Sequence, residues 1–316
     1  MAEDNRHPLV EDLKRAVPED VLERFRAETC IAGDLEYKLP QVLRASVHDA
    51  EPGQVVDRAV HVINHCLLIR EGLEIGKILD DDYFPPSVVQ MLEERSCLSV
   101  VGDDERGNPV IYFNLKRFNP SEYTKLWQAG SRPVPERFRG HPELNDPCVV
   151  NYCSLWYVRM MEWLHAHRFD KFRSGGCREP KVAMVLNIEA AGLSTYTPEL
   201  RQFLKGIKVL GGYLFPEICD YIYAANVPWI ADKFWSLMKM ILHPETVEKV
   251  NICDKSRTKK TLKDHISDES LPICFGGHYV PELRFKRRLQ GTDSPSEPPH
   301  KKSHGACSTL PPAVSS

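Results

Sequence analysis

Residues 221–253 read YIYAANVPWIADKFWSLMKMILHPETVEKVNIC. Aromatic and β-branched residues at both ends of this stretch predict short strands at 221–225 and 250–253. Pro228 stands where the intervening helix would begin, and the first helical turn tolerates proline because its N–H has no partner there. A strand, a helix and a second strand form a crossover unit. Because strands and helices also alternate elsewhere in the chain, we expect an α/β protein.

The helix expected between these strands, residues 229–242, is apolar on nearly every side. Its apolar surface is broken by only four residues, which are Asp232, Lys233, Ser236 and Lys239. A surface helix ordinarily has an apolar stripe about 100° wide. The helix is therefore either buried on all sides or faces something that is not always water. Its large apolar side chains are Trp229, Ile230, Phe234, Trp235, Met238 and Ile241.

Four blocks of sequence occur in a characteristic order: 215–217 (FPE), 223–229 (YAANVPW), 243–250 (HPETVEKV) and 271–277 (LPICFGG). Together they resemble the CRAL-TRIO lipid-binding domain, which is found in phosphatidylinositol-transfer proteins, the tocopherol-transfer protein and the retinaldehyde-binding protein. The resemblance implies an α/β CRAL-TRIO fold. In that fold a helical N-terminal module is followed by a mixed β-sheet floor, which helices cover around a hydrophobic lipid cavity.

Size and composition restrict the classes of function. The chain has 316 residues, 42% of them apolar, and a formal charge of −3, so no global field favours nucleic acid. The start of the chain shows no signal peptide, and no uncharged apolar run approaches the ~20 residues of a membrane span. Ten cysteines without a regular framework indicate a reducing compartment. We expect a cytoplasmic monomer that meets a membrane surface transiently and binds no nucleic acid.

Three segments of different character divide the chain. Residues 1–98 show helical periodicity and form the expected N-terminal module. Residues 99–285 form the expected lipid-binding domain. Residues 286–316 begin with a basic cluster and are rich in serine, proline and glycine, which is typical of a disordered tail.

Within the second segment, the pattern predicts the order of elements. Residues 116–147 are polar and proline-rich and predict a long surface excursion. A long helix is expected over 149–172 and a central strand over 181–189. A further helix is expected over 198–210, with Gly211 and Gly212 ending it.

Two histidines, His61 and His65, lie four residues apart in a predicted helix and share one face of it. Zinc needs more ligands than these two, and the neighbouring sequence offers none. We therefore expect a structural role and no metal. The chain also lacks the glycine-rich dinucleotide motif, the P-loop and the G-x-S-x-G elbow. We expect no cofactor and no enzymatic activity.

Alternation along the predicted central strand places Val182, Met184, Leu186 and Ile188 on one face. The resemblance implies that this face is the floor of the lipid cavity. The alternative is that these side chains simply pack under a helix.

In phosphatidylinositol-binding members of the family, an acidic residue and a later threonine and lysine form part of the headgroup site. The matching residues here are Glu217, Thr246 and Lys249. A lysine can offset phosphate charge, a threonine can donate to phosphate, and a carboxylate can accept from inositol hydroxyls. The alternative is a purely structural ion pair.

Two departures from the family pattern bear on the ligand. Ser46 and Val47 stand where those members carry an Arg–Lys pair, and only Arg44 is near. Met184 and Leu186 stand where phosphatidylcholine exchangers carry serine and threonine. Choline-lipid binding is therefore disfavoured, and the cavity floor is more apolar.

These observations lead to one main hypothesis and two alternatives. The main hypothesis is a lipid-binding and lipid-transfer protein with phosphatidylinositol as the favoured ligand and the 229–242 helix as its gate. The first alternative keeps the fold and exchanges the ligand for a sterol, a tocopherol or a retinoid. The second is a protein-interaction module in which the lipid is only a structural filler.

Overall fold

A computed structural model describes residues 7–29, 34–51, 53–128, 134–169, 179–189, 197–227, 236, 239, 244–280 and 285. The gate residues proposed from sequence all lie outside this described part: Trp229, Ile230, Phe234, Trp235, Met238 and Ile241. Their assignment as a gate therefore stays a prediction.

Five strands form one mixed sheet in the order β1-β2-β3-β4-β5. The strands are β1 (Leu98–Asp103), β2 (Pro109–Asn114), β3 (Val182–Asn187), β4 (Cys219–Val227) and β5 (Val250–Asp254). β1 runs antiparallel to β2, whereas β2, β3, β4 and β5 are parallel to one another. The predicted α/β class with a mixed sheet is confirmed, and β3 is the central strand.

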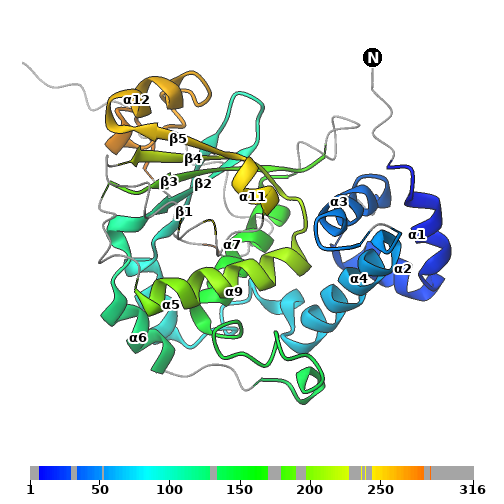
Figure 1. The fold of residues 1–316 in the computed structure, drawn as a ribbon. Coiled ribbons are helices and arrows are strands. Elements are labelled where there is room, and N and C mark those ends of the chain that lie inside the picture. Colours follow the sequence, from blue (N-terminus) through cyan, green and yellow to red (C-terminus); the bar gives the residue numbers. More distant parts are fainter. Residues whose placement is uncertain are drawn as a thin grey trace, which may run out of the picture. The chain divides into compact units, whose positions relative to one another are not determined.

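The two faces of the sheet belong to different apolar clusters. On β3, Ala183 and Val185 pack into a small cluster that includes Leu262 of α12 (Lys255–Lys263). Val182 belongs to the larger core on the opposite face, and Met184 is half-buried against that core. Figure 1 shows α12 on one side of the sheet and the helices α7 and α9 on the other. The predicted alternation of β3 is thus present.

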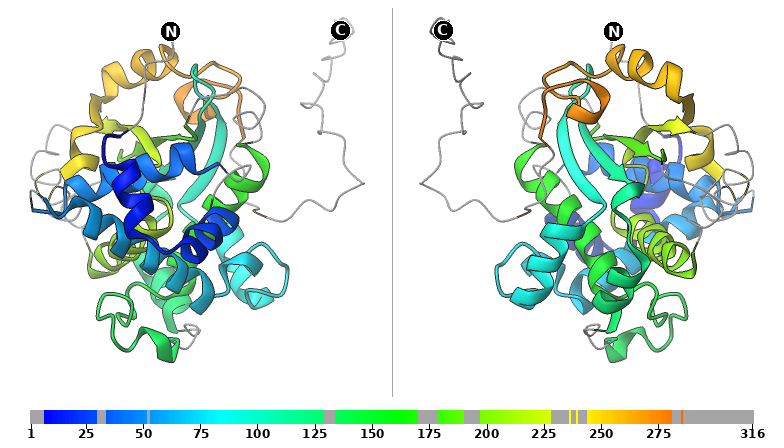
Figure 2. Two further views of the ribbon diagram at one scale, coloured as in Figure 1. Left: turned by 90° about the vertical axis from the view of Figure 1, so that its right-hand side faces the viewer. Right: turned by 90° about the vertical axis from the view of Figure 1, so that its left-hand side faces the viewer.

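The first third of the chain is helical, as predicted, in the part that the structure describes. Its helices are α1 (Val10–Ala16), α2 (Glu19–Thr29), α3 (Leu35–Val47), α4 (Val55–Gly72), η2 (Ile75–Lys77) and α5 (Pro86–Arg95). Helices α1, α2 and α3 each contact α4, and Figure 2 shows them in blue on one side of the chain. Their buried residues belong to the same apolar core as Val182 and Met184 of β3. No described helix is long and apolar enough to cross a membrane.

The prediction that residues 116–147 form a long surface excursion is wrong for part of this segment. It contains η3 (Leu115–Arg117), the helix α6 (Pro120–Gln128) and η4 (Glu136–Phe138). Tyr123 and Leu126 are three residues apart, so they share one face of α6, and both are buried. These two buried side chains hold α6 against the main apolar core.

The helix predicted over 149–172 is α7 (Tyr152–His167), and it carries a buried cation. Arg159 is 1% exposed. Its Nε donates to the Phe285 carbonyl at 2.6 Å, and its terminal nitrogens donate to the carbonyls of Asp80 and Leu79 at 3.3 and 3.4 Å. Burial lowers the pKa of Arg159. These carbonyls satisfy a cation that would otherwise be costly to bury, and they connect three distant segments.

The helix α9 (Pro198–Leu214) passes through the two glycines that were expected to end it. Leu214, beyond both, is 1% exposed, so burial of this last turn outweighs the poor helix propensity of glycine. Gly206, earlier in α9, is required by a close approach to α7. A Cβ at Gly206 would lie 2.1 Å from the Ser154 Oγ, whereas a Cβ at Gly212 would meet nothing within 4 Å.

Two short helices complete the described chain, α11 (Pro244–Glu248) and η6 (Ile273–Phe275). All seven cysteines in the described part are unpaired thiols, and Cys274 is the exposed one. Burial raises the pKa of the Cys66 thiol to about 11. The buried thiols are therefore protonated and behave as small apolar residues.

Candidate functional site

Two residues expected at a lipid headgroup meet at one edge of the sheet. Glu217 lies two residues before β4, and Lys249 immediately precedes β5. Because β4 and β5 are parallel neighbours, their amino ends meet at the same edge. The Lys249 Nζ lies 3.0 Å from Glu217 Oε1. Thr246 lies in α11, three residues before Lys249, and is half-buried.

A second lysine holds the backbone of Glu217 in an uncommon conformation. Glu217 has φ 55°, in the left-handed region that side chains other than glycine rarely adopt. The Lys181 Nζ donates to the Glu217 carbonyl at 2.5 Å and lies 3.3 Å from Glu217 Oε2. Two ammonium groups thus flank one carboxylate whose side chain is 9% exposed. Strained residues held by their surroundings are frequent at functional sites.

The charges continue toward the N-terminal helices. Lys181 lies 3.4 Å from Glu179, and Glu179 accepts from Arg44 of α3 at 2.5 Å. Figure 1 shows α3 and α11 at the same end of the sheet. The row therefore alternates in sign from Arg44 to Lys249, with three cations and two anions and one net positive charge. We call these five residues the charged row: Arg44, Glu179, Lys181, Glu217 and Lys249.

The pKa of Glu217 reflects two opposing effects. Burial raises the pKa of this carboxyl, but the charges of Lys181 and Lys249 outweigh burial, so its pKa lies below the ordinary value. Glu217 is therefore ionised at neutral pH. The row can accept hydrogen bonds from hydroxyl groups and can donate to a phosphate through its lysines.

The residues predicted to form the cavity floor begin next to the charged row in the chain. Val182 is the residue after Lys181, and it is 1% exposed, whereas Ile188 is 8% exposed. Met184 and Leu186 are only half-buried, although they lie in the middle of the central strand. A central strand normally has both faces covered, so Met184 and Leu186 are more accessible than is usual at such a position.

A cavity of about 360 Å³ lies elsewhere, between α5, β1, η3, α6, α7 and α9. Its size falls within the usual range for small-molecule pockets. None of the four predicted floor residues lines this cavity, so the floor assignment stays a prediction. Its lining includes the large apolar side chains of Leu92, Leu98, Phe118, Tyr123, Leu126, Trp156 and Phe203.

Sequence reasoning missed two members of the charged row, Glu179 and Lys181. A signal for them exists, because charged residues directly precede the apolar run of β3 and a lysine also precedes β5. In a parallel sheet these starting points lie at the same end, with the start of β4 between them. The pattern becomes readable only once the strand order is known.

Comparison with known proteins identifies the family. Residues 93–277, which are 185 of the 316 residues, match the CRAL/TRIO domain. The chain belongs to the CRAL/TRIO domain family. This confirms the resemblance drawn from the four sequence blocks. The family is one of lipid-binding and lipid-transfer proteins.

Two curated relatives share part of the chain. The SEC14 cytosolic factor of Eremothecium gossypii is 24% identical over 176 residues, which are 52% of this chain and 53% of that protein. The SEC14 cytosolic factor of Yarrowia lipolytica is 30% identical over 93 residues, which are 29% of this chain and 18% of that protein. The chain thus spans about half the length of the first relative. The crystal structure of Sfh5 is 12% identical, with a TM-score of 0.48, over 80% of this chain and 81% of that one.

Proposed function

We propose that this protein binds a single lipid in a hydrophobic cavity and transfers or presents it between membranes, with phosphatidylinositol as the favoured ligand. The observation that carries the proposal is the contact of Glu217 with Lys249, at the edge where the apolar face of β3 begins. A charged rim beside a half-covered apolar face suits a molecule with a polar head and apolar chains.

Each polar group has a task in this proposal. Lys249 offsets the charge of the lipid phosphate, and Thr246 donates a hydrogen bond to it. Glu217 accepts hydrogen bonds from inositol hydroxyls while it keeps Lys249 in place. Lys181 and Arg44 add positive charge from the other side of Glu217, which partly replaces the basic pair that the N-terminal module lacks.

The proposal also requires a gate over the apolar ligand. Burying an acyl chain yields about 0.8 kcal/mol per methylene, so two chains give a gross stabilisation on the order of 20 kcal/mol. Such a surface cannot be left open to water. We assign the gate to the 229–242 helix, whose aromatic residues suit a membrane interface. Release then needs a shift between two packings of one helix during transient membrane contact.

The proposed division of labour follows the three segments of the chain. Residues 99–285 hold the ligand, and residues 1–98 form a helical module beside the headgroup. Residues 286–316 form a tail outside the lipid-binding domain.

The first test is mass spectrometry of lipid extracted from the purified protein. Phosphatidylinositol in the extract supports the proposal, and protein without any lipid contradicts it. The second test is transfer of phosphatidylinositol between vesicles by Lys249→Ala. We expect a loss of transfer, because the phosphate loses its cation. The matched control is Lys255→Ala, which removes a lysine from an exposed pair with Glu189 at 3.0 Å. Equal transfer by both variants would remove the headgroup assignment.

A second candidate ligand is a wholly apolar molecule such as a sterol, a tocopherol or a retinoid. The partial exposure of Met184 and Leu186 favours it, because these side chains offer no hydrogen bond to a ligand above them. The same lipid extract separates the two candidates. A sterol or a retinoid in the extract in place of a phospholipid would favour the wholly apolar ligand.

A further inference from the structure

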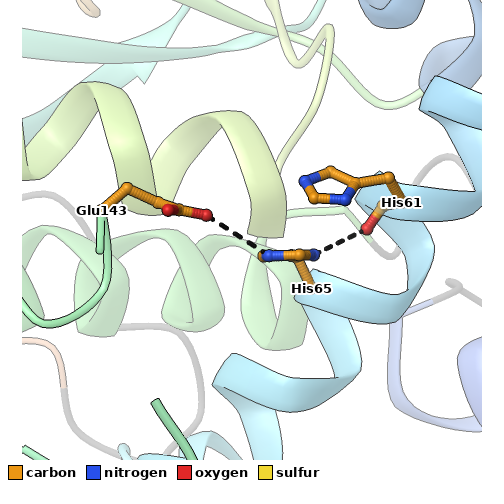
Figure 3. A group of neighbouring side chains, drawn as sticks. All are labelled: His61, His65 and Glu143. Atoms are coloured by element: carbon orange, nitrogen blue, oxygen red, sulfur yellow. Dashed lines mark hydrogen bonds and ion pairs between the residues drawn. The ribbon is translucent and has the colours of Figure 1, made fainter. Parts of the chain in front are cut away.

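Three side chains distant from the charged row converge on one point. His61 and His65 lie one turn apart on α4, with their ring centroids 3.8 Å apart. Glu143 reaches them from the loop between η4 and α7. One nitrogen of each histidine and one carboxylate oxygen of Glu143 all lie within 4.8 Å of one another. Figure 3 shows the carboxylate directed at the ring of His65.

The hydrogen bonds of His65 fix which ring nitrogen carries a proton. Its Nδ1 lies 3.0 Å from the His61 carbonyl oxygen, which can only accept, so Nδ1 carries the hydrogen. In a neutral ring Nε2 then presents a lone pair. This Nε2 is buried and has no hydrogen-bond partner within the described chain, and it lies 3.3 Å from Glu143 Oε1. A lone pair therefore faces a carboxylate oxygen.

Either a proton on Nε2 or a cation between the two atoms would relieve this repulsion. The His65 side chain is 7% exposed, so a charged ring would be poorly solvated. A bound metal ion removes the conflict without protonating the ring, because both atoms become its ligands. Metal-binding histidines commonly donate their other ring N–H to a backbone carbonyl, as His65 does.

We propose that His61, His65 and Glu143 bind a divalent transition metal ion of the class that prefers imidazole, with zinc as the first member. Two histidines and one carboxylate are a known zinc ligand set that leaves the fourth position to water. The Tyr213 hydroxyl of α9 lies 3.5 Å from His61 Nε2 and 3.4 Å from Glu143 Oε1. This hydroxyl therefore lies beside two of the three proposed ligands.

The spacing of the ligands shows what binding requires. Zinc–ligand bonds of about 2.0–2.1 Å place two ligands roughly 3.3 Å apart in a tetrahedron. The three ligand atoms lie within 4.8 Å of one another, and Glu143 Oε1 already lies 3.3 Å from His65 Nε2. Glu143 and His65 are therefore at the spacing that zinc requires, and binding requires His61 to reach the same distance from both.

Charged and titratable groups surround the three proposed ligands. Burial and the charge of Arg58 lower the pKa of His61. Burial raises the pKa of Glu143, but a hydrogen bond from its backbone and the nearby His65 outweigh this, so its pKa lies below the ordinary value. His141 packs edge-on against His65, with ring centroids 4.6 Å apart.

One cation faces the site from α4 and opposes metal binding. Arg58 lies 6.0 Å from the centre of the Tyr213 ring. Its guanidinium donates to Asp49 at 2.9 Å, which offsets its charge. Because the ligands come from α4 and from the loop before α7, a bound ion would fasten an N-terminal helix to the lipid-binding domain.

The test uses the full chain, stripped of metal and then titrated with Zn²⁺ alone and with Co²⁺ alone. We expect one Co²⁺ ion with a tetrahedral visible spectrum and a thermal unfolding midpoint that rises with Zn²⁺. Glu143→Gln keeps the shape of the side chain, and His61→Gln removes a half-buried ligand. Each is expected to weaken binding by more than the roughly 10- to 100-fold that loss of an outer partner costs.

The matched controls are His265→Gln and Glu105→Gln, which alter an exposed His–Glu pair at 3.0 Å. They are expected to bind Co²⁺ as the unaltered chain does. Two results would overturn the proposal. One is the absence of Co²⁺ and Zn²⁺ binding by the unaltered chain. The other is an affinity of Glu143→Gln and of His61→Gln equal to that of the unaltered chain, since the ion would then belong to cysteine thiols elsewhere. Neither result bears on lipid binding.

Discussion

Neutralising Glu217 tests whether the charged row stabilises the fold. Glu217→Gln keeps the size of the side chain and leaves Lys181 and Lys249 without their shared carboxylate. Each contact, at 3.3 and 3.0 Å, corresponds to a gross attraction of about 5 kcal/mol at an effective dielectric constant of about 20. Much of this is offset by desolvation of the three groups. Breaking a buried pair typically costs about 3–5 kcal/mol.

The lysines of the charged row are partly accessible, so the expected cost is below the upper end of that range. Lys181 and Lys249 are 16% and 22% exposed, and water can relieve part of their repulsion. We expect Glu217→Gln to lower the free energy of unfolding by about 2–4 kcal/mol. For a chain of this size that corresponds to a fall of roughly 3–6 °C in the thermal midpoint.

The assay is a double-mutant cycle by urea unfolding, with Glu217→Gln, Lys249→Met and the double variant. We expect a coupling energy of about 1.5–3 kcal/mol, because the two groups are in direct contact. The control cycle uses Glu189→Gln and Lys255→Met, whose side chains are 45% and 79% exposed. Exposed pairs of this kind contribute about 0.2–1 kcal/mol.

The pH dependence of the same cycle has a defined sign. The folded-state pKa of Glu217 lies below its ordinary value of 4.5. The carboxylate therefore contributes its full stability above the unfolded pKa and loses it as the pH falls through the folded pKa. The difference between the unaltered chain and Glu217→Gln should be constant near neutral pH and should shrink below pH 4.5. A coupling energy no larger than that of the control pair would refute the reasoning.

Three further predictions concern packing. Gly206→Ala should destabilise the chain by about 1–3 kcal/mol, because its Cβ would enter α7. Gly212→Ala should be neutral or stabilising by up to about 1 kcal/mol in the same urea assay, and equal effects would contradict the packing account. Arg159→Lys should lower the free energy of unfolding by about 2–3 kcal/mol, because lysine cannot reach the three carbonyls at once. An unchanged thermal midpoint would contradict this prediction. Peptide-mapped alkylation should modify Cys274 in the folded protein and Cys66 only after unfolding, and early modification of Cys66 would show that it is not buried.

Much of the architecture was predictable because it depends on short-range patterns. The strand at 182–187 alternates with a period of two, so its two faces could be assigned before any partner was known. The predictions from sequence failed where tertiary packing outweighed local propensity. Gly211 did not end α9, because the burial of Leu214 outweighed it. The polar segment around α6 was drawn inward by Tyr123 and Leu126.

The sequence alone determined the family, the α/β class and the face of the central strand, because the four sequence blocks and the side-chain period can be read from neighbouring residues. Only the tertiary structure decided which charges meet. Arg44 and Glu179 are 135 residues apart, and they pair because α3 lies at the end of β3. Likewise, the His61–His65 pair was visible from its spacing on one helix. Glu143 became its partner only because a loop near residue 143 folds back over α4, and such long-range contacts leave no trace in the neighbouring residues.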